Sequence, residues 1–445
     1  MTRIGPYNNG DCNNAYPGSL NLRGEIQELD LPVFNLVKRL GPKKFVFHGG
    51  SRNVAIRNGQ LAVLGDGHLK ILDAESLAEL RILPTVVTHG CPGWFQTELT
   101  AETTRGLQGH SVPCGLSTIY WLENGVVAVT PGGDIGKTIG RLDLIRVEGD
   151  AALPVVPKTG NQREYLGAAD GNPTILRTLG GHAWGRINVS TLAGGNIKVN
   201  TVLNNPCYIS TRDYHYVIGS PKQQKEVSGD GRILNDQMAW TPGITISRIG
   251  ADLKPEGIYQ TEGYNLPWGA DACYWPQPWC MAAGVICIAT SSGHVVKLNP
   301  GTTLAESSRY TTGLINPRIA VDRSGRVAIL GQWGNGNLRT ATASTTVSLD
   351  FEAYRNNKQF CNHLAVDDDK LYVAKMLNGL FTIDIFKTSD CTRIQQIYRK
   401  IEGADTSGQC VDFFLHDGAA YALLNVSEPV TEITRKFSQK LLRVT

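Results

Sequence analysis

Residues 371–389 read LYVAKMLNGLFTIDIFKTS, two apolar runs joined at Asn378-Gly379 and followed by a polar turn. Asn-Gly between runs of β-branched and aromatic residues favours a two-residue hairpin turn, because both turn residues adopt positive φ at little cost. The same order recurs in residues 61–77 (LAVLGDGHLKILDAESL) and 285–304 (VICIATSSGHVVKLNPGTTL). The sequence therefore predicts a repeated β-hairpin unit.

A third apolar segment precedes several of these hairpins at a nearly constant distance. Each of these segments runs into a turn, such as Asn58-Gly59 or Asp417-Gly418. A weaker fourth strand often follows the hairpin, for example at residues 77–83. The repeating unit is therefore a small antiparallel sheet of three or four strands. The preceding segments are NVAIR at 53–57, STIYW at 117–121, RIAVD at 318–322, HLAVD at 363–367 and VDFFL at 411–415.

The spacing of the repeat predicts the fold class. Second strands begin near residues 61, 126, 216, 285, 327, 371 and 420, at intervals of about 42 to 70 residues, and a less certain unit lies at 174–190. The shorter intervals match one propeller blade. A lone four-stranded sheet cannot bury both faces, whereas radial stacking buries them. We predict an all-β chain with one β-propeller of about seven four-stranded blades, within a range of six to eight, over residues 45–445; two stacked β-sandwich domains are the alternative.

The composition favours a turn-rich β protein and excludes several function classes. The 445 residues include 49 glycines and 4 methionines, and 43 Lys and Arg nearly balance 40 Asp and Glu, so no basic field predicts nucleic-acid binding. No run approaches the ~18 apolar residues of a membrane span. No secretory signal pattern is visible, so we expect synthesis in the cytoplasm. The ten cysteines contain no Cys-x-x-Cys pair, the spacing typical of zinc sites.

The first 44 residues depart from the repeat and are predicted to form an N-terminal arm. Its first 25 residues are rich in Asn, Gly and Pro, which indicates an extended chain. Asp30 is then a candidate N-cap for a short helix that ends at Gly41. This helix either packs on the propeller or docks onto another subunit. Its predicted apolar face consists of Val33, Leu36, Val37 and Leu40.

The sequence contains no convincing catalytic, metal or cofactor motif. Residues 131–138 (PGGDIGKT) resemble a phosphate loop, but Pro131 stands where that motif needs glycine and the following segment reads as a strand. The run 367–369 (DDD) lies in a hairpin turn, where three acids are more often solvated than converged around a calcium ion. We therefore predict no catalytic residues, no metal and no cofactor.

One group of residues is predicted to gather at a mouth of the central channel. Cys361 lies ten residues before Leu371 and Cys410 lies ten before Ala420, so both cysteines take equivalent places at the start of inner strands. This group forms either a buried polar ring with ordered water or a small-ligand or metal site. Its members are Arg318, Cys361, Asn362, His363, Gln409 and Cys410.

An aromatic cluster in residues 259–280 is the second candidate site. Flat aromatic faces stack on sugars or on an apolar partner surface, and Trp and Tyr are enriched at binding hot spots. The alternative is an internally packed loop that shields a blade edge. Cys273 and Cys280 bracket its Pro-rich part and are expected to pair under oxidising conditions. The predicted partner- or glycan-binding residues are Tyr264, Trp268, Tyr274, Trp275 and Trp279.

The repeats resemble the β-propeller blades of the YVTN and quinoprotein groups, over roughly residues 45–445. This resemblance implies the fold and leaves function open. The Gly-His…Trp-Asp signature of tryptophan-aspartate repeats is absent. A weaker resemblance, in style alone, connects the chain to phage virion structural proteins that carry a propeller.

These patterns favour a non-enzymatic structural or interaction protein. The concrete prediction is a component of a large assembly of protein subunits, such as the tail, neck or capsid surface of a phage virion, with a cytoplasmic location as the alternative. A second possibility is a glycan- or receptor-binding propeller that uses the aromatic loop 259–280. A third is a polysaccharide lyase or hydrolase at the channel mouth, for which His363, Arg318 and Asp322 are the candidates.

Overall fold

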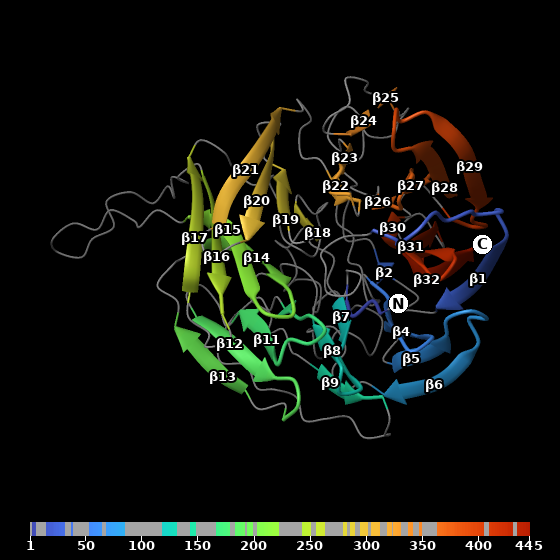
Figure 1. Cartoon of the computed structure of the whole chain (residues 1–445). Helices are drawn as coiled ribbons and strands as arrows, with labels where there is room; N and C mark the ends of the chain where they lie inside the picture. Colours follow the sequence, from blue (N-terminus) through green and yellow to red (C-terminus); the bar gives the residue numbers. More distant parts are fainter. Residues whose placement is uncertain are drawn as a thin grey trace.

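The computed structural model shows antiparallel β-sheets arranged as the blades of a propeller around a central axis (Figure 1). Its described residues form strands and turns, and none of them is helical. The description covers residues 2–5, 15–31, 37–38, 53–64, 68–84, 118–130, 143–147, 166–178, 183–191, 194–198, 203–221, 243–250, 255–262, 279–282, 285–289, 294–300, 304–311, 318–322, 324–330, 337–340, 347–348, 363–404, 409–429 and 434–445.

The first four blades follow one another along the chain as antiparallel meanders. Blade I contains β3 (Ala55–Arg57), β4 (Gln60–Leu64), β5 (His68–Asp73) and β6 (Glu79–Pro84). Blade II contains β7 (Thr118–Trp121), β8 (Val126–Thr130) and β9 (Asp143–Arg146). Blade III contains β10 (Leu166–Gly167), β11 (Thr174–Thr178), β12 (Ala183–Asn188) and β13 (Gly194–Lys198). Blade IV contains β14 (Leu203–Ser210), β15 (His215–Pro221), β16 (Gly243–Ile249) and β17 (Pro255–Glu262).

The remaining blades complete the ring. Blade V contains β18 (Trp279–Ala282), β19 (Val285–Ala289), β20 (His294–Pro300) and β21 (Leu304–Thr311). Blade VI contains β22 (Arg318–Val321), β23 (Val327–Leu330), β24 (Asn337–Thr340) and β25 (Val347–Ser348). Blade VII contains β26 (His363–Val366), β27 (Lys370–Leu377), β28 (Leu380–Lys387) and β29 (Arg393–Lys400). Blade VIII joins β30 (Gln409–His416), β31 (Ala419–Pro429) and β32 (Thr434–Val444) to β1 (Ile26–Leu31), with β2 (Val37–Lys38) also paired to β32.

The all-β propeller predicted from the repeat is confirmed. Eight sheets are present in the described part of the chain, at the upper end of the predicted range. The less certain unit at residues 174–190 is a genuine blade, because β11 and β12 pair there from Thr174↔Asn188 onward. Its run is shorter and less apolar than the others, which is why its strands gave the weakest signal.

The hairpin turns have the geometry that their residues favour. Asn378 and Gly379 both have positive φ, 49° and 74°, and they connect β27 to β28 with Leu377 opposite Leu380. Asn58-Gly59 repeats this pair of angles at 52° and 72°. Two successive positive φ angles match the right-handed twist of the strands that they join. These short-range signals therefore fix the register of the blades.

The hydrophobic core lies between neighbouring blades. One cluster joins Val54 and Ile56 of blade I to Phe414 and Tyr421 of blade VIII, all almost fully buried. A second cluster joins blade VII, including Phe381, to blade VIII. Because each interior sheet packs on both faces, its strands read as nearly continuous apolar runs. Burial of both faces is therefore what closes the ring.

The short helix predicted to begin at Asp30 is wrong. Asp30 lies within β1, which pairs antiparallel with β32 from Ile26↔Val444 to Leu31↔Gln439. Val37 lies in β2 and pairs with Arg435 of the same strand. An open strand edge offers a row of unpaired backbone groups, and this pairing outweighed the local helical spacing. The rest of the predicted helix face, Val33, Leu36 and Leu40, lies outside the described residues.

Part of the N-terminal arm belongs to the last blade of the ring. Thr445 accepts hydrogen bonds from the backbone N–H groups of Arg23, Gly24 and Glu25 at 2.7–3.1 Å, and its own N–H donates to the Glu25 carbonyl at 2.9 Å. The two ends of the chain therefore meet in one sheet. The division of the chain at residue 44 stays a prediction, whereas β1 is the fourth strand of blade VIII.

Candidate functional site

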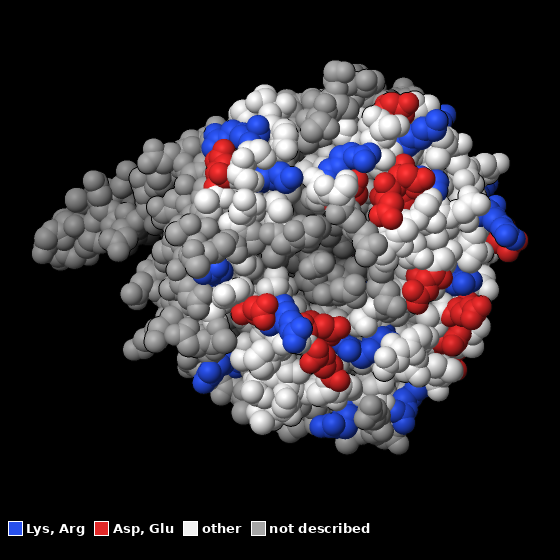
Figure 2. Space-filling view, viewed as in Figure 1, with Lys and Arg blue, Asp and Glu red and all other residues white. Residues whose placement is uncertain are grey.

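Acidic and basic side chains are mixed on the face of the molecule shown in Figure 2, where they are interspersed around the ring. Several of them are paired, as in Arg57 of blade I, whose guanidinium lies 2.5 Å from the Asp170 carboxylate of blade III. This distribution agrees with the nearly balanced charge of the sequence and offers no electrostatic footprint for a polyanion.

The predicted channel-mouth residues lie at the starts of three innermost strands. Arg318, His363 and Gln409 are the first residues of β22, β26 and β30, and these strands contact one another in the order VI, VII, VIII. Their strand register therefore places them at one end of the ring. Cys361 and Asn362 lie outside the described residues, and nothing is described of the Arg318 and Gln409 side chains.

His363 and Cys410 connect two blades in this region. The buried His363 ring has its Nε2 atom 2.9 Å from the Cys410 carbonyl oxygen, an N–H···O contact across blades VII and VIII. The buried Cys410 thiol lies 3.4 Å from the carbonyl oxygen of Asp412. Asp322 follows β22, about 13 Å along the strand from Arg318 at ~3.3 Å per residue. The His/Arg/Asp set considered for an enzyme stays a prediction, because the Arg318 side chain is not described.

The aromatic loop falls mostly outside the described residues. Tyr264, Trp268, Tyr274 and Trp275 belong to that undescribed part. Trp279 is the first residue of β18, where its backbone pairs with Ile288, and its side chain is not described. The role of this loop in binding stays a prediction, and so does the Cys273–Cys280 bridge.

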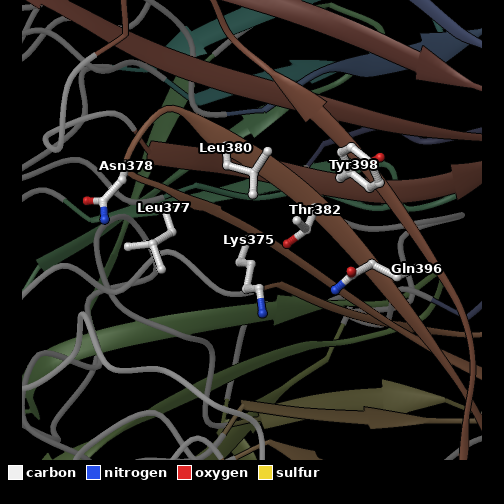
Figure 3. Close-up of a pocket in the computed structure, with 7 residues that line it drawn as sticks. All are labelled: Lys375, Leu377, Asn378, Leu380, Thr382, Gln396 and Tyr398. Atoms are coloured by element: carbon white, nitrogen blue, oxygen red, sulfur yellow. The ribbon is translucent and has the colours of Figure 1, made fainter.

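A pocket of about 590 Å³ opens on blade VII (Figure 3). Strands β27, β28 and β29 contribute its walls, and the turn after β27 contributes its rim. The view shows the Lys375 ammonium, the Thr382 hydroxyl and the Gln396 side chain directed toward the same space. The residues that line the pocket are Lys375, Leu377, Asn378, Leu380, Thr382, Gln396 and Tyr398.

The pocket lies on the face of blade VII that is turned toward blade VI. Side chains alternate between the two faces of a strand. Leu371 and Val373 of β27 pack against Ala320 and Ala328 of blade VI, so Lys375 continues the same face. In the paired strands Thr382 lies opposite Lys375 and next to Tyr398. The inner part of this face is buried between blades, and its outer part forms the pocket.

Polar groups at the base of the pocket are organised around a buried carboxylate. Asp384 is buried, its Oδ2 lies 3.1 Å from the Lys375 ammonium, and its Oδ1 accepts a hydrogen bond from Gln396 at 2.6 Å. Arg393 approaches the same carboxylate at 3.6 Å from the exposed side. Lys375 and Gln396 are therefore held in position by Asp384.

Thr382 and Tyr398 make the pocket suited to binding. The Thr382 side chain is buried, and its hydroxyl has no hydrogen-bond partner among the residues that the structure describes. A buried hydroxyl without a partner costs about 1–3 kcal/mol. Tyr398 is 66% exposed and Leu380 is 40% exposed, which is unusual beside such an apolar sheet. The site therefore combines apolar walls with donors that an incoming acceptor would satisfy.

Sequence reasoning missed this pocket, although β28 carried a signal for it. In the apolar run LFTIDIFK, Thr382 and Asp384 interrupt one face only. That alternation marks one polar face within an otherwise buried hairpin. A polar ladder on one face of a blade, continued by Lys375 and Gln396 on the neighbouring strands, would have identified the site.

A second, smaller pocket of about 440 Å³ lies where turns of blades III and IV meet. His215 at its base is buried, with Nδ1 2.7 Å from the Ser210 hydroxyl and Nε2 3.0 Å from the Thr174 hydroxyl. Burial lowers the pKa of His215 to about 4, although the contact with Thr174 opposes this shift. The ring is therefore neutral at physiological pH and ties blade III to blade IV.

The sheet order defines this chain as a β-propeller repeat protein. No protein-family model and no curated protein sequence matches it. Similar solved structures include the computationally designed Ika8 protein (10% identity, 91% of this chain, 99% of that chain, TM-score 0.49). BamB from Moraxella catarrhalis is also similar, with 9% identity over 95% of this chain and 100% of that chain and a TM-score of 0.46. Sqt1 from Saccharomyces cerevisiae has 11% identity over 99% of both chains and a TM-score of 0.45. Because these TM-scores lie below 0.5, we infer no function for this chain from these structures.

Within the described residues, no helix is long and apolar enough to cross a membrane. The same part of the chain contains no group of three or more His, Cys, Asp or Glu side chains placed to hold a metal ion.

Proposed function

We propose that the chain is a non-catalytic interaction scaffold that binds a protein partner through the pocket on blade VII. The observation that carries this proposal is the exposed aromatic ring of Tyr398 above a buried, unpartnered Thr382 hydroxyl. An apolar pocket with a few convergent polar groups is the usual form of a binding site. Its carboxylate, Asp384, is already engaged by Lys375 and Gln396, which suits positioning more than proton transfer.

The distribution of exposed apolar side chains supports a protein partner. Among the described residues, the large exposed ones lie on blades I and VII, which flank the composite blade VIII. Figure 1 shows β29, β1 and β6 along one side of the ring perimeter. Clustered apolar exposure marks interaction sites in soluble proteins. The exposed residues are Leu80, Ile82, Leu380, Ile394 and Tyr398.

Our proposal extends to a structural place in a large assembly, with a phage virion as the concrete case and other subunits as partners. A ring closed by both chain ends is a rigid platform, and its perimeter supplies the surface for neighbours. Light scattering on the full chain and on Leu80→Asp tests this extension. A native mass above one chain that falls in the variant supports assembly, and a monomer in both overturns self-assembly through this perimeter.

A peptide-display selection on the immobilised full chain tests the blade VII site. Peptides are selected from a random library, and their binding is compared between the native chain and Tyr398→Ala. We expect peptides whose affinity falls at least about tenfold in the variant, since aromatic anchors dominate interface energies. Arg309→Ala, an exposed site on the outer strand of blade V, is the control. A selection that yields no peptide sensitive to Tyr398→Ala overturns the proposal.

A further inference from the structure

We propose that the partner segment is an extended acidic strand that pairs with the outer edge of β29 beside the blade VII pocket. This inference rests on the proposed function, because it names the chemistry of the segment that binds there. It follows from three properties of blade VII: an open edge, a cationic edge sequence and an exposed aromatic ring on the pocket face of that edge.

The outer edge of β29 is available for pairing. The sheet order is β26-β27-β28-β29, and within the described residues β29 pairs with β28 alone. An edge strand presents unpaired N–H and C=O groups to which another segment can add. This chain already uses such addition in the neighbouring blade, where β1 covers the edge of β32 over six residue pairs. The eight residues of β29, six of them exposed, offer an edge of comparable length.

The sequence of β29 selects the charge of the added strand. β29 reads RIQQIYRK, with Arg393, Arg399 and Lys400 exposed and no acidic residue. Like charges on directly opposed strands are destabilising, so two copies of β29 repel each other. The Arg399 Nε atom forms an ion pair with the Glu28 Oε2 atom at 3.3 Å, so this strand already attracts one carboxylate of the same chain. An acidic segment is therefore favoured over a second copy of the chain.

The pocket selects the side chains on one face of that strand. Gln396, Tyr398 and Lys400 lie on the pocket face, because they pair with Asp384, Thr382 and Leu380. An added strand presents every second side chain to this face. Next to Tyr398, an apolar side chain of the added strand covers the exposed ring. Next to Lys400, an acidic side chain meets the exposed ammonium group.

Fluorescence anisotropy with synthetic peptides tests this inference on the full chain. The probe is a fluorescein-labelled peptide in which Glu alternates with Leu and Phe, and the comparison peptide has Lys in place of Glu. We expect the Glu peptide to bind at least about tenfold more tightly than the Lys peptide, and its affinity to fall with added salt. The double variant Arg399→Glu/Lys400→Glu should lose about tenfold in affinity, and the charge reversal Arg309→Glu on the outer strand of blade V should lose none.

Binding of N-methylated peptides tests whether the peptide backbone pairs with β29. Two versions of the Glu peptide carry N-methyl groups on alternate residues, one set in each version. A strand added at an edge directs only one of these sets toward β29, so one version should bind and the other should not. Equal binding of both versions, or loss in both, overturns strand addition.

The outcomes separate this inference from the proposed function. Selected peptides that depend on Tyr398 but lack acidic residues, or that tolerate Arg399→Glu/Lys400→Glu, overturn the acidic strand and leave the scaffold proposal standing. Failure of both the selection and the anisotropy experiment overturns the two together.

Discussion

Arg3 and Asp412, 409 residues apart in the chain, form a buried two-bond ion pair. Nη1 and Nη2 of Arg3 each donate to one carboxylate oxygen at 2.8 Å, and the guanidinium lies 3.9 Å from the centre of the Phe414 ring. Val54 of blade I donates its backbone N–H to the same carboxylate at 3.0 Å. The N-terminus therefore holds blade VIII and blade I together at the closure of the ring.

Removing one partner of this pair should weaken the fold strongly. Burial raises the pKa of Asp412, and the Arg3 guanidinium opposes that rise. Arg3→Met leaves a buried carboxylate without its cation, so we expect a loss of about 3–5 kcal/mol in the free energy of unfolding. Urea unfolding measures it. The double variant Arg3→Met/Asp412→Leu should lose less than the sum of the two single variants, and additive losses would contradict the coupling.

Deleting residues 1–31 should open the ring. The deletion removes β1, so the edge of β32 becomes unpaired, and Asp412 loses Arg3. We expect a lower melting temperature and concentration-dependent self-association, because exposed edges pair with other chains. A synthetic peptide of residues 15–31 should restore part of the lost stability by mass action. A truncated chain that melts like the full chain would show that the arm is dispensable for closure.

Alanine substitutions at Gly59 and Gly379 distinguish the cost of a left-handed backbone from the cost of a steric clash. Gly379 and Gly59 have nearly the same φ, 74° and 72°, but a Cβ on Gly379 would lie 2.8 Å from the Ala404 carbonyl oxygen, whereas Gly59 faces open space. Gly59→Ala should cost about 1–2 kcal/mol for its left-handed conformation alone. Gly379→Ala should lower the free energy of unfolding by more than this amount, because the new methyl group also clashes with the Ala404 carbonyl. Equal costs in thermal unfolding would contradict a contribution from the Ala404 contact.

His215 should make stability fall in acid. Its pKa is lowered to about 4 in the fold, below the ~6.5 of an exposed histidine, so folding favours the neutral ring. This contribution is complete above about pH 6.5 and is lost as pH falls toward 4, by at most about 3 kcal/mol. His416, whose pKa burial also lowers to about 4, acts in the same direction while the nearby Asp417 carboxylate opposes it.

His215→Gln isolates this contribution. Urea unfolding of both chains at about pH 7.5 and about pH 4.5 gives the difference, in which His416 and the carboxylates cancel. We expect the native chain to lose more stability between the two conditions than the variant does. Parallel curves would mean that His215 does not titrate with a lowered pKa.

Thr382→Val should stabilise the chain. The variant keeps the side-chain volume and removes a buried hydroxyl that lacks a partner, so we expect up to about 1 kcal/mol of added stability. Thermal unfolding measures this gain. Thr388→Val is the contrasting control, because the Thr388 hydroxyl accepts a hydrogen bond from Arg326 and donates one to the Asp369 carbonyl. A loss of stability in Thr382→Val would mean that the hydroxyl is satisfied in solution.

Strand pairing within blades could be predicted from the sequence because its signals are local. Asn378-Gly379 sets the turn and register of one hairpin, and the same chemistry recurs at Asn58-Gly59. The position of the site could not be predicted in this way. Lys375, Thr382 and Tyr398 come from three strands, and the pairing of those strands brings them to one pocket.

The structure of the N-terminal arm could not be predicted from local sequence patterns. By itself, the sequence determined the repeat, its turns and the all-β class, because apolar periodicity and turn residues act over a few neighbours. The tertiary structure decided that Asp30 lies in a strand, that Arg3 reaches Asp412, and that blade VIII is assembled from both ends of the chain. These contacts connect residues hundreds of positions apart, and the free edge of β32 and the buried charge of Asp412 exist only once the ring has formed.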